Sequence, residues 1–383
     1  MSLSILVSAG EASGDFYAAE LVRELRRRRP DSTFFGCAGP HLREASVEAV
    51  IHSEDLSVVG IVEVIGHLPR IWNRFRQLTS EAARRSPDLA ILTDSPDFHF
   101  RVAARLKKRG VPVVYLVAPQ VWAWRKGRVR TMRRYIDRLL CIFPFEQAFF
   151  EEHHIPVTYI GHPLSTRVRP TLSREEFFRK HNLPADRPLV TVLPGSRRSE
   201  ALRHLPELIR AAGILSGSRD LSFLLPASPT CGAEFYREPL AGSAIRPIEG
   251  EAWDAMAHCD VALAASGTVT VEGALLGAPM VTFYKVTGLS WAIGKVLVDV
   301  PFYSMVNLIA QKKVVPELMQ SDMTGERIAA EAAALLDNPA ERAKMKSELA
   351  RVAALLAADG DAIRNAADAV ERVLEVASMR TGQ

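Results

Sequence analysis

The sequence has no apolar stretch of about 18 residues, the length that a membrane-spanning helix needs. Its apolar run at residues 3–9 breaks at Gly10-Glu11 and follows no basic segment, so it is too short for a signal peptide. Only four cysteines occur in 383 residues, and none forms a CxxC pair, which is typical of reduced thiols in a cytosolic protein. We therefore expect a cytoplasmic protein that is at most peripheral to a membrane.

The patterns that hold metals and cofactors are also missing. The chain contains no HExxH or Walker motif, so we predict that it needs no metal and no cofactor. The net charge of +4 is too mild to indicate nucleic acid as a partner, and no nucleic-acid-binding motif is present. Residues 1–165 nevertheless carry 23 Lys and Arg against 18 Asp and Glu, which favours an anionic ligand or an anionic membrane surface.

What the chain does contain is a repeated alternation of short apolar runs and amphipathic stretches, which predicts an α/β fold with parallel sheets. Its length suits two domains, and the polar, proline-bearing stretch at 165–188 separates them. We predict two Rossmann-like domains, 1–165 and 166–340, facing each other across a cleft. Residues 341–383 are expected to be helices that pack back on an N-terminal domain, their own or that of another chain. The expected strands span 3–9, 33–36, 89–93, 111–118, 139–143, 157–160, 189–193, 221–226, 261–265 and 280–284.

The stretch 261–284 has the pattern of a strand, a small-residue turn, a short helix and a second strand. A helix N-terminus carries unpaired N–H groups and a partial positive charge, so this one can hold a phosphate. Ser266 and Thr268 add hydroxyl donors, and Gly267 lets the backbone come close. Glu272, one turn further on, can accept a hydrogen bond from a sugar hydroxyl. The alternative is an ordinary strand–helix junction capped by Ser or Thr.

A second anion-binding signal follows the expected strand at 189–193. The loop PGSRRSE sets Arg197 and Arg198 beside a Gly-Ser turn, which suits bidentate contact with a phosphate. Together the two segments describe a diphosphate site. Without a metal motif, this combination fits a glycosyltransferase with two Rossmann-like domains, in which a helix dipole and basic side chains stabilise the departing nucleotide.

The first half of the chain places acidic residues at the ends of expected strands. The loop GEASGD follows the first strand, where doubly wound folds bind ligands, but it is not a GxGxxG motif and gives little support to a dinucleotide site. Asp94 and Asp97 follow the strand at 89–93. Each can act as a general base or merely cap the next helix.

Residues 60–78 carry apolar and basic side chains at helical spacing. They fit either a helix of the core or an interfacial helix whose apolar face meets acyl chains while its arginines meet phosphates. The tryptophan among arginines favours the interfacial helix. The predicted membrane or acyl contacts are Leu68, Ile71, Trp72 and Phe75.

Seven segments, in order along nearly the whole chain, closely resemble the lipid-A-disaccharide synthase family. They are SAGEASGD at 8–15, TDSPDF at 93–98, APQVWAWR at 118–125, GHPL at 161–164, LPGSR at 193–197, SGTVTVE at 266–272, and NLIA with VPEL at 307–318. The resemblance implies an inverting, metal-independent transferase of the GT-B type. Such an enzyme moves 2,3-diacylglucosamine from UDP-2,3-diacylglucosamine to 2,3-diacylglucosamine 1-phosphate, giving a β-1,6-linked disaccharide 1-phosphate and UDP.

The resemblance also implies roles for individual residues. Asp97 would be the general base that deprotonates the acceptor 6-hydroxyl, with Glu11 and Ser13 in the same pocket. Asn307 would lie at the cleft, although Val306 stands where the family pattern leads us to expect a proline. The inner face of the cytoplasmic membrane would be an anionic partner surface, and a homodimer is left open. The residues implied to bind UDP are Arg197, Arg198, Ser266, Gly267, Thr268, Glu272 and Asn307.

Two other kinds of function stay open on the sequence alone. A UDP-N-acetylglucosamine epimerase or a transferase with a soluble acceptor would share the phosphate-binding helix, but would not need an apolar helix rich in Arg and Trp. A non-catalytic nucleotide-sugar or lipid-binding protein would tolerate loss of the Asp97 carboxylate, whereas the transferase would not.

Overall fold

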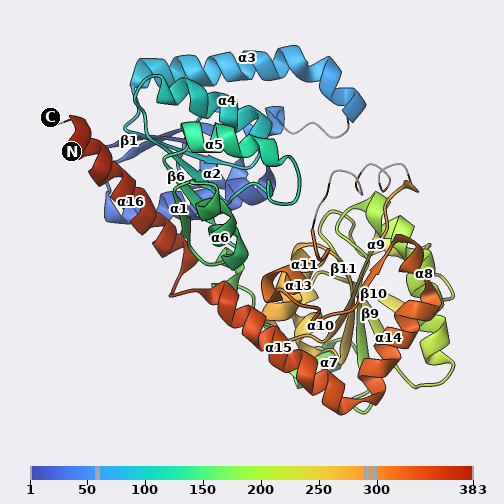
Figure 1. The fold of residues 1–383 in the computed structure, drawn as a ribbon. Coiled ribbons are helices and arrows are strands. Elements are labelled where there is room, and N and C mark those ends of the chain that lie inside the picture. The colour runs from blue at the N-terminus through green and yellow to red at the C-terminus, as the bar shows by residue number, and fades with distance from the viewer. Residues whose placement is uncertain are drawn as a thin grey trace. The chain divides into compact units, whose positions relative to one another are not determined.

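The structure, a computed structural model, describes residues 2–56, 61–288, 291, 294, 298 and 300–381, and the side chains of these except 61–68, 126, 380 and 381. The chain divides into two compact units. Unit 1 contains the residues up to Pro163 together with those from Leu356 onward, and unit 2 is Leu164–Leu355. In Figure 1 the last helix, drawn in red, accordingly lies against the blue first helix of unit 1.

Unit 1 is built on a parallel sheet whose described strands follow the order β3-β2-β1-β4-β5-β6-β7. The chain runs outward from β1 to β3 and then returns to continue on the other side of β1. In such doubly wound sheets, ligands bind at the carboxyl ends of the strands where the order reverses, which here means β1 and β4. The strands are β1 (Ser4–Ala9), β2 (Thr33–Ala38), β3 (Glu48–His52), β4 (Leu89–Thr93), β5 (Val113–Leu116), β6 (Arg138–Cys141) and β7 (Val157–Tyr159).

Helices cover both faces of this sheet, with α3, α4 and α5 over one face and α1 and α16 over the other (Figure 1). The α1–α16 contact is partly ionic, because Arg28 Nη1 lies 2.5 Å from Asp368 Oδ1 and 3.0 Å from Glu371 Oε2. Asn365 also donates to the Ile160 carbonyl at 3.0 Å. The helices are α1 (Ala12–Arg28), α2 (Pro40–Glu44), α3 (Ile61–Arg85), α4 (Pro96–Lys107), α5 (Val129–Tyr135), α6 (Pro144–Glu152) and α16 (Ala362–Thr381).

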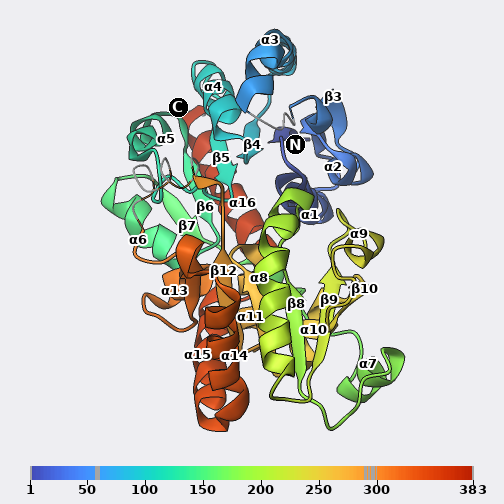
Figure 2. The same cartoon turned by 90° about the vertical axis from the view of Figure 1, so that its right-hand side faces the viewer.

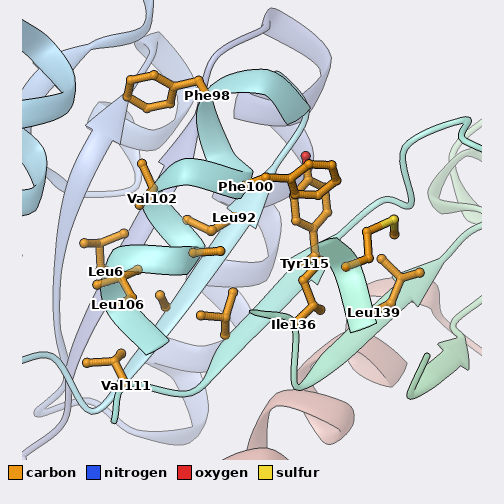
Figure 3. Close-up of a cluster of buried hydrophobic side chains, with 14 of the residues drawn as sticks. Leu6, Leu92, Phe98, Phe100, Val102, Leu106, Val111, Tyr115, Ile136 and Leu139 are labelled. Atoms are coloured by element: carbon orange, nitrogen blue, oxygen red, sulfur yellow. The ribbon is translucent and has the colours of Figure 1, made fainter. Parts of the chain in front are cut away.

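One part of the core of unit 1 lies between the sheet and helices α3, α4 and α5. Strands buried on both faces have continuous apolar sequences, and β4 is such a run, LAILT, with every residue buried. Figure 3 shows Val102 and Leu106 of α4 in one cluster with Leu6 and Leu92. Phe98 points away from these strands and packs on Phe75 of α3. Tyr115 stands in the same cluster beside Phe100, with its hydroxyl directed toward the start of α4 (Figure 3).

Unit 2 contains a second parallel sheet, with described strands in the order β10-β9-β8-β11-β12-β13. Figure 2 shows α8 and α14 side by side over this sheet. The strands are β8 (Leu189–Leu193), β9 (Ser222–Ala227), β10 (Ile245–Glu249), β11 (Val261–Ala265), β12 (Met280–Tyr284) and β13 (Glu317–Met319). The helices are α7 (Arg174–Lys180), α8 (Arg198–Ser216), α9 (Glu234–Arg237), α10 (Ala252–His258), α11 (Thr268–Leu275), α13 (Met305–Ala310), α14 (Gly325–Asp337) and α15 (Pro339–Ala357), which ends just inside unit 1.

Two Rossmann-like units and helices at the C-terminus were predicted from the sequence, and both are present. The GEASGD segment differs from the prediction of a loop, since α1 begins inside it at Ala12. The cysteines, all four buried and free, are core residues: Cys37, Cys141, Cys231 and Cys259.

Candidate active site

A pocket of about 350 Å³ lies at the carboxyl ends of β1 and β4 in unit 1. Its volume falls in the range of small-molecule sites. Three segments line it, namely the start of α1, the turn between β4 and α4, and the loop that follows β5. The lining residues are Glu11, Ser13, Gly14, Tyr17, Thr93, Asp94, Ser95, Pro96, Val117, Ala118, Pro119, Gln120, Val121, Trp124 and Arg128.

Asp94 is the buried carboxylate of this pocket. Its Oδ1 accepts the Gly10 N–H at 2.8 Å and its Oδ2 accepts the Glu11 N–H at 3.0 Å. Burial raises the pKa of Asp94 to about 7, although these two backbone donors act in the opposite direction. A carboxyl group with a pKa near neutral pH can both take up and release a proton, as a general base must.

The turn that carries Asp94 is strained and is held from behind. Asp94 and Ser95 have φ angles of 53° and 36°, in the left-handed region that non-glycine residues rarely adopt. The Asp94 carbonyl accepts a hydrogen bond from the Tyr115 hydroxyl, and His99 Nδ1 lies 2.9 Å from the same oxygen. Burial lowers the pKa of His99 to about 4, so the ring is neutral and donates from Nδ1. Its Nε2 then accepts from the Ser8 hydroxyl at 2.7 Å.

The GEASGD segment is the other half of this scaffold. Gly14 faces the Asp94 carboxylate across the first turn of α1, and no larger residue fits there. Asp15 is fully buried and accepts the N–H groups of Gly39 at 2.7 Å and His41 at 2.8 Å, at the start of α2. The second half of the motif is therefore helical. Its Gly14 packs against Asp94 at the end of β4, and its Asp15 accepts hydrogen bonds from the start of α2.

Asp97, which we predicted to be the base, occupies a different position. It lies in the first turn of α4 with a side chain that is 74% exposed, and its carboxylate pairs with Arg125 and Arg128. It is absent from the pocket lining, whereas Glu11 and Ser13 are part of it. Of the two carboxylates in TDSPDF, Asp94 is the one that is buried and lines the pocket.

The loop after β5 is held by a residue that the sequence did not single out. Glu146 is buried at the start of α6, where its Oε1 accepts from Trp122 Nε1 at 3.0 Å and its Oε2 accepts from the Phe143 N–H at 3.2 Å. Burial raises the pKa of Glu146 to about 7. The loop that carries Trp122 also supplies Trp124 and Arg128 to the pocket. The Glu146 carboxylate therefore holds in place one wall of the unit 1 pocket. A glutamate placed between phenylalanines in FPFEQAFF was the available signal.

Unit 2 has its own pocket, of about 760 Å³, at the carboxyl ends of β8, β9 and β11. Gly195 and Ser196 line it from the loop after β8, and Gly267, Thr268 and Glu272 line it from the start of α11. Burial raises the pKa of Glu272, and a hydrogen bond from the Trp253 side chain opposes that shift. The two loops predicted to form a diphosphate site therefore meet at one pocket.

Four of the residues predicted to bind UDP are not in the described lining of this pocket, namely Arg197, Arg198, Ser266 and Asn307. Arg197 and Arg198 are exposed at the N-terminus of α8, and the Arg198 guanidinium lies 5.2 Å from the centroid of the Phe235 ring. Ser266 donates from Oγ to the Tyr303 carbonyl at 2.9 Å. The two arginines directly follow the Gly195–Ser196 turn in the sequence, Arg197 as the N-cap of α8 and Arg198 as its first residue.

Asn307 has a structural role instead of the predicted position facing substrate. It is fully buried, and Nδ2 donates to the Val315 carbonyl at 3.0 Å and to Glu317 Oε1 at 2.8 Å. Its Oδ1 accepts the N–H groups of Val314 at 2.7 Å and Val315 at 3.0 Å. These four bonds use the full capacity of the amide, so none is left for a ligand.

The predicted membrane face of α3 is smaller in the structure than in the sequence. Trp72 is 49% exposed, but Phe75 is only 6% exposed and lies 6.2 Å from Phe98, ring centroid to ring centroid. The prediction for Phe75 is therefore wrong, because the residue belongs to the core. Ile71 is half-buried against that core, and the side chain of Leu68 lies outside the described residues.

Neither a membrane-spanning helix nor a metal cluster occurs in the part of the chain that the structure describes. No helix there is long and apolar enough to cross a bilayer. No group of three or more His, Cys, Asp or Glu side chains there is placed to hold a metal ion.

Comparison with solved structures bears on the fold. A putative UDP-N-acetylglucosamine 2-epimerase from Listeria monocytogenes has a TM-score of 0.65 and 16% identity, covering 98% of this chain and 97% of that one. The glycotransferase of kitacinnamycin also has a TM-score of 0.65 and 16% identity, over 97% of this chain and 99% of that one. At such low identity these similarities show the fold alone, which is the predicted GT-B fold.

Comparison of sequences identifies the family. A family described as lipid-A-disaccharide synthetase matches residues 5–370. The lipid-A-disaccharide synthase of Solibacter usitatus (strain Ellin6076) is 62% identical over 371 residues, which cover 97% of each chain. That of Koribacter versatilis (strain Ellin345) is 43% identical over 354 residues, 91% of this chain and 92% of its own. The chain therefore belongs to the lipid-A-disaccharide synthase family and is a hexosyltransferase of lipid A biosynthesis.

Proposed function

We propose that the chain transfers 2,3-diacylglucosamine from UDP-2,3-diacylglucosamine to the 6-hydroxyl of 2,3-diacylglucosamine 1-phosphate, with inversion and without a metal. Membership of the family supports a UDP-sugar donor and a lipid acceptor. A UDP-GlcNAc 2-epimerase from Neisseria meningitidis, which shares the fold with a TM-score of 0.59 and 14% identity, was solved bound to UDP-GlcNAc. That complex supports the proposal that a protein with this fold, such as this chain, binds a UDP-sugar.

The observation that carries the proposal is the buried carboxylate in the unit 1 pocket. We assign the general base to Asp94, because its pKa of about 7 suits proton uptake at neutral pH. Two backbone amides and a strained turn orient the carboxylate before substrate arrives. The Thr93 hydroxyl beside it is buried with no hydrogen-bond partner among the described residues, so a sugar hydroxyl can supply one.

The reaction then follows from these groups. Asp94 takes the proton of the acceptor 6-hydroxyl as the oxygen attacks the anomeric carbon of the donor from the face opposite the diphosphate. The bond from that carbon to the diphosphate oxygen breaks, and UDP leaves with the electron pair. The configuration inverts because attack and departure occur on opposite faces.

Donor binding is assigned to the unit 2 pocket. The N–H groups at the start of α11 and the Gly195–Ser196 turn would contact the diphosphate, with Arg197 and Arg198 at the same loop neutralising its charge. Glu272 would accept from the ribose. Replacing Arg197 by Ala is expected to weaken UDP binding in a calorimetric titration, and unchanged affinity would remove this residue from the site.

The decisive experiment compares Asp94→Asn with Asp97→Asn. Purified protein is incubated with both lipid substrates, and UDP and the disaccharide 1-phosphate are measured by mass spectrometry. We expect Asp94→Asn to lose turnover by a factor on the order of 10³ while it still binds UDP, since general-base catalysis contributes roughly 10²–10⁴-fold. If Asp97→Asn loses turnover and Asp94→Asn keeps it, the base is Asp97. If the unmodified protein forms no disaccharide, the proposed reaction is wrong.

We also propose that the protein binds the anionic inner face of the cytoplasmic membrane as a peripheral protein. The support is the half-exposed Trp72 on α3 and the excess of basic residues in the first half of the chain.

A further inference from the structure

Two guanidinium groups converge on one exposed carboxylate beside the unit 1 pocket. Arg125 Nη1 lies 3.2 Å from Asp97 Oδ2, and Arg128 Nη2 pairs with Asp97 Oδ1. Each arginine therefore contacts a different oxygen of the same anion. The Arg128 side chain is only 14% exposed and lines the pocket, so its charge faces the space that a substrate would fill.

An aromatic ring supports both cations. The Arg125 and Arg128 guanidinium carbons lie 4.5 Å and 5.6 Å from the centroid of the Trp124 ring. Stacking on an indole holds a guanidinium in a fixed plane without using its N–H donors. Arg125 also has a left-handed backbone, with φ of 59°, which marks a locally strained turn. The arginines are thus oriented before any ligand arrives.

The Asp97 carboxylate is a weak partner for so well ordered a pair. Its side chain is mostly in solvent, and an exposed ion pair contributes little to stability. A phosphate monoester carries up to two negative charges and three terminal oxygens, so it can accept from both guanidiniums at once. An incoming phosphate can therefore take the place that Asp97 occupies.

We infer that Arg125 and Arg128, stacked on Trp124, form the subsite for the phosphate monoester of the acceptor, and that Asp97 holds the two guanidiniums in place until that phosphate binds. The inference rests on the proposed function for the chemistry of the acceptor. In that molecule the 1-phosphate is on C1 and the reacting 6-hydroxyl is on the carbon attached to C5, and C1 and C5 flank the ring oxygen of one sugar. Asp94 and Arg128 line the same pocket, so one ring can present its hydroxyl to the first and its phosphate to the second.

The test measures binding of glucosamine 1-phosphate to the full chain by calorimetry, without a donor. We expect Arg128→Ala and Arg125→Ala each to weaken binding roughly tenfold or more, since each removes a charge-assisted hydrogen bond to the phosphate. Arg128→Lys keeps the charge but loses the forked donor geometry, and should fall in between. Arg101→Ala, an exposed arginine on α4 outside the pocket, is the matched control and should bind as the unmodified protein does.

Asp97→Asn separates this role from that of a base. Because the amide no longer competes for the guanidiniums, its affinity for glucosamine 1-phosphate should equal or exceed that of the unmodified protein. Equal affinity in all the arginine variants would overturn the inference, as would a loss in Asp97→Asn as large as that in Arg128→Ala. If Arg128→Ala does not fold, as judged by circular dichroism, the half-exposed Arg125→Ala decides alone.

Two further arms identify the source of the phosphate. Glucosamine without phosphate should bind weakly and with no dependence on the arginines. Vesicles of phosphatidylglycerol should bind Arg128→Ala as well as the unmodified protein, and loss of vesicle binding with unchanged sugar phosphate binding would make the pair a lipid headgroup contact instead. In turnover, the arginine variants should raise the KM for the acceptor and leave that for the donor. Sugar phosphate binding without any transfer would reject the proposed reaction and keep the subsite.

Discussion

A Cβ atom on Gly14 would lie 1.9 Å from Oδ2 of Asp94, closer than any side chain can approach. The helix and the carboxylate are therefore fitted to each other across the unit 1 pocket. Gly14→Ala is expected to displace the carboxylate and to lower kcat at least tenfold, with UDP affinity unchanged. Gly213→Ala in α8, where a Cβ meets nothing within 4 Å, is the matched control and should be stabilised by about 0.5–1 kcal/mol. Equal kcat in the two variants would contradict a tight fit at Asp94.

The pH dependence of kcat/KM should follow the ionisation of the proposed general base, Asp94. Asp94 must be ionised to accept a proton, and burial holds its pKa at about 7. We expect kcat/KM to fall about tenfold per pH unit below pH 7 and to level off above it. His99, which touches the same turn, has a pKa of about 4 and is neutral throughout this window. An acidic limb near pH 4 would instead point to a carboxylate that burial does not perturb.

Glu146 should make unfolding dependent on pH. Its pKa is raised from 4.5 to about 7, so its contribution to stability is fully present below pH 4.5 and is lost as pH rises through 7. Urea titrations between pH 5 and pH 8 should show the unmodified protein losing on the order of 2–3 kcal/mol relative to Glu146→Gln. Cys141 and Tyr159 face the same carboxylate, but burial raises the pKa of each well beyond this window. Parallel profiles for the two proteins would rule out this origin.

Membrane binding is best tested at a single residue. Trp72→Ser should weaken co-sedimentation with vesicles that contain anionic lipid, since it removes the half-exposed indole of α3. Ile214→Ser on α8, which is similarly exposed in unit 2, is the control and should bind as before. Phe75→Ser is unsuitable, because emptying a buried aromatic site costs roughly 3–5 kcal/mol and would unfold part of unit 1. Equal binding of Trp72→Ser and the control would remove α3 from the membrane contact.

Asn307→Ala should act on stability rather than on binding. The substitution leaves the N–H groups of Val314 and Val315 and the Glu317 carboxylate without the amide that now joins them. Unfolding midpoints in urea should drop by the equivalent of about 3 kcal/mol, since each unsatisfied buried group costs roughly 1–3 kcal/mol. The folded variant should bind UDP with unchanged affinity, and a selective loss of UDP affinity would restore the role predicted from sequence.

The sequence predicted the repeated α/β pattern and most of the strands because a strand buried on both faces must be a continuous apolar run. It missed β3, β10 and β13, which have polar or short sequences such as EAVIH and IRPIE and form strands only because the sheet is already there. GEASGD was predicted to be a loop, because the neighbouring residues in the sequence do not indicate that the Asp15 carboxylate bonds to the start of α2.

The site was predicted in its segments more than in its residues. TDSPDF drew attention to two carboxylates three positions apart, but burial distinguishes them, and burial depends on the turn after β4 and on Tyr115 and His99 beneath it. Trp72 and Phe75 likewise share a helical face, yet one points outward and the other packs on Phe98. Contacts between segments that are distant in the sequence decide which of these side chains is buried, and the spacing of residues along one helix does not predict such contacts.

The salt bridges between α1 and α16 join residues more than 300 positions apart, Arg28 with Asp368 and Glu371. During synthesis, unit 1 cannot complete its fold until the ribosome has translated the whole of unit 2, because α16 follows unit 2 in the chain. A premature stop codon shortly before that helix would leave α1 uncovered. Because the start of α1 lines the unit 1 pocket, a truncation at the end of the gene would then affect a site that is encoded near its beginning.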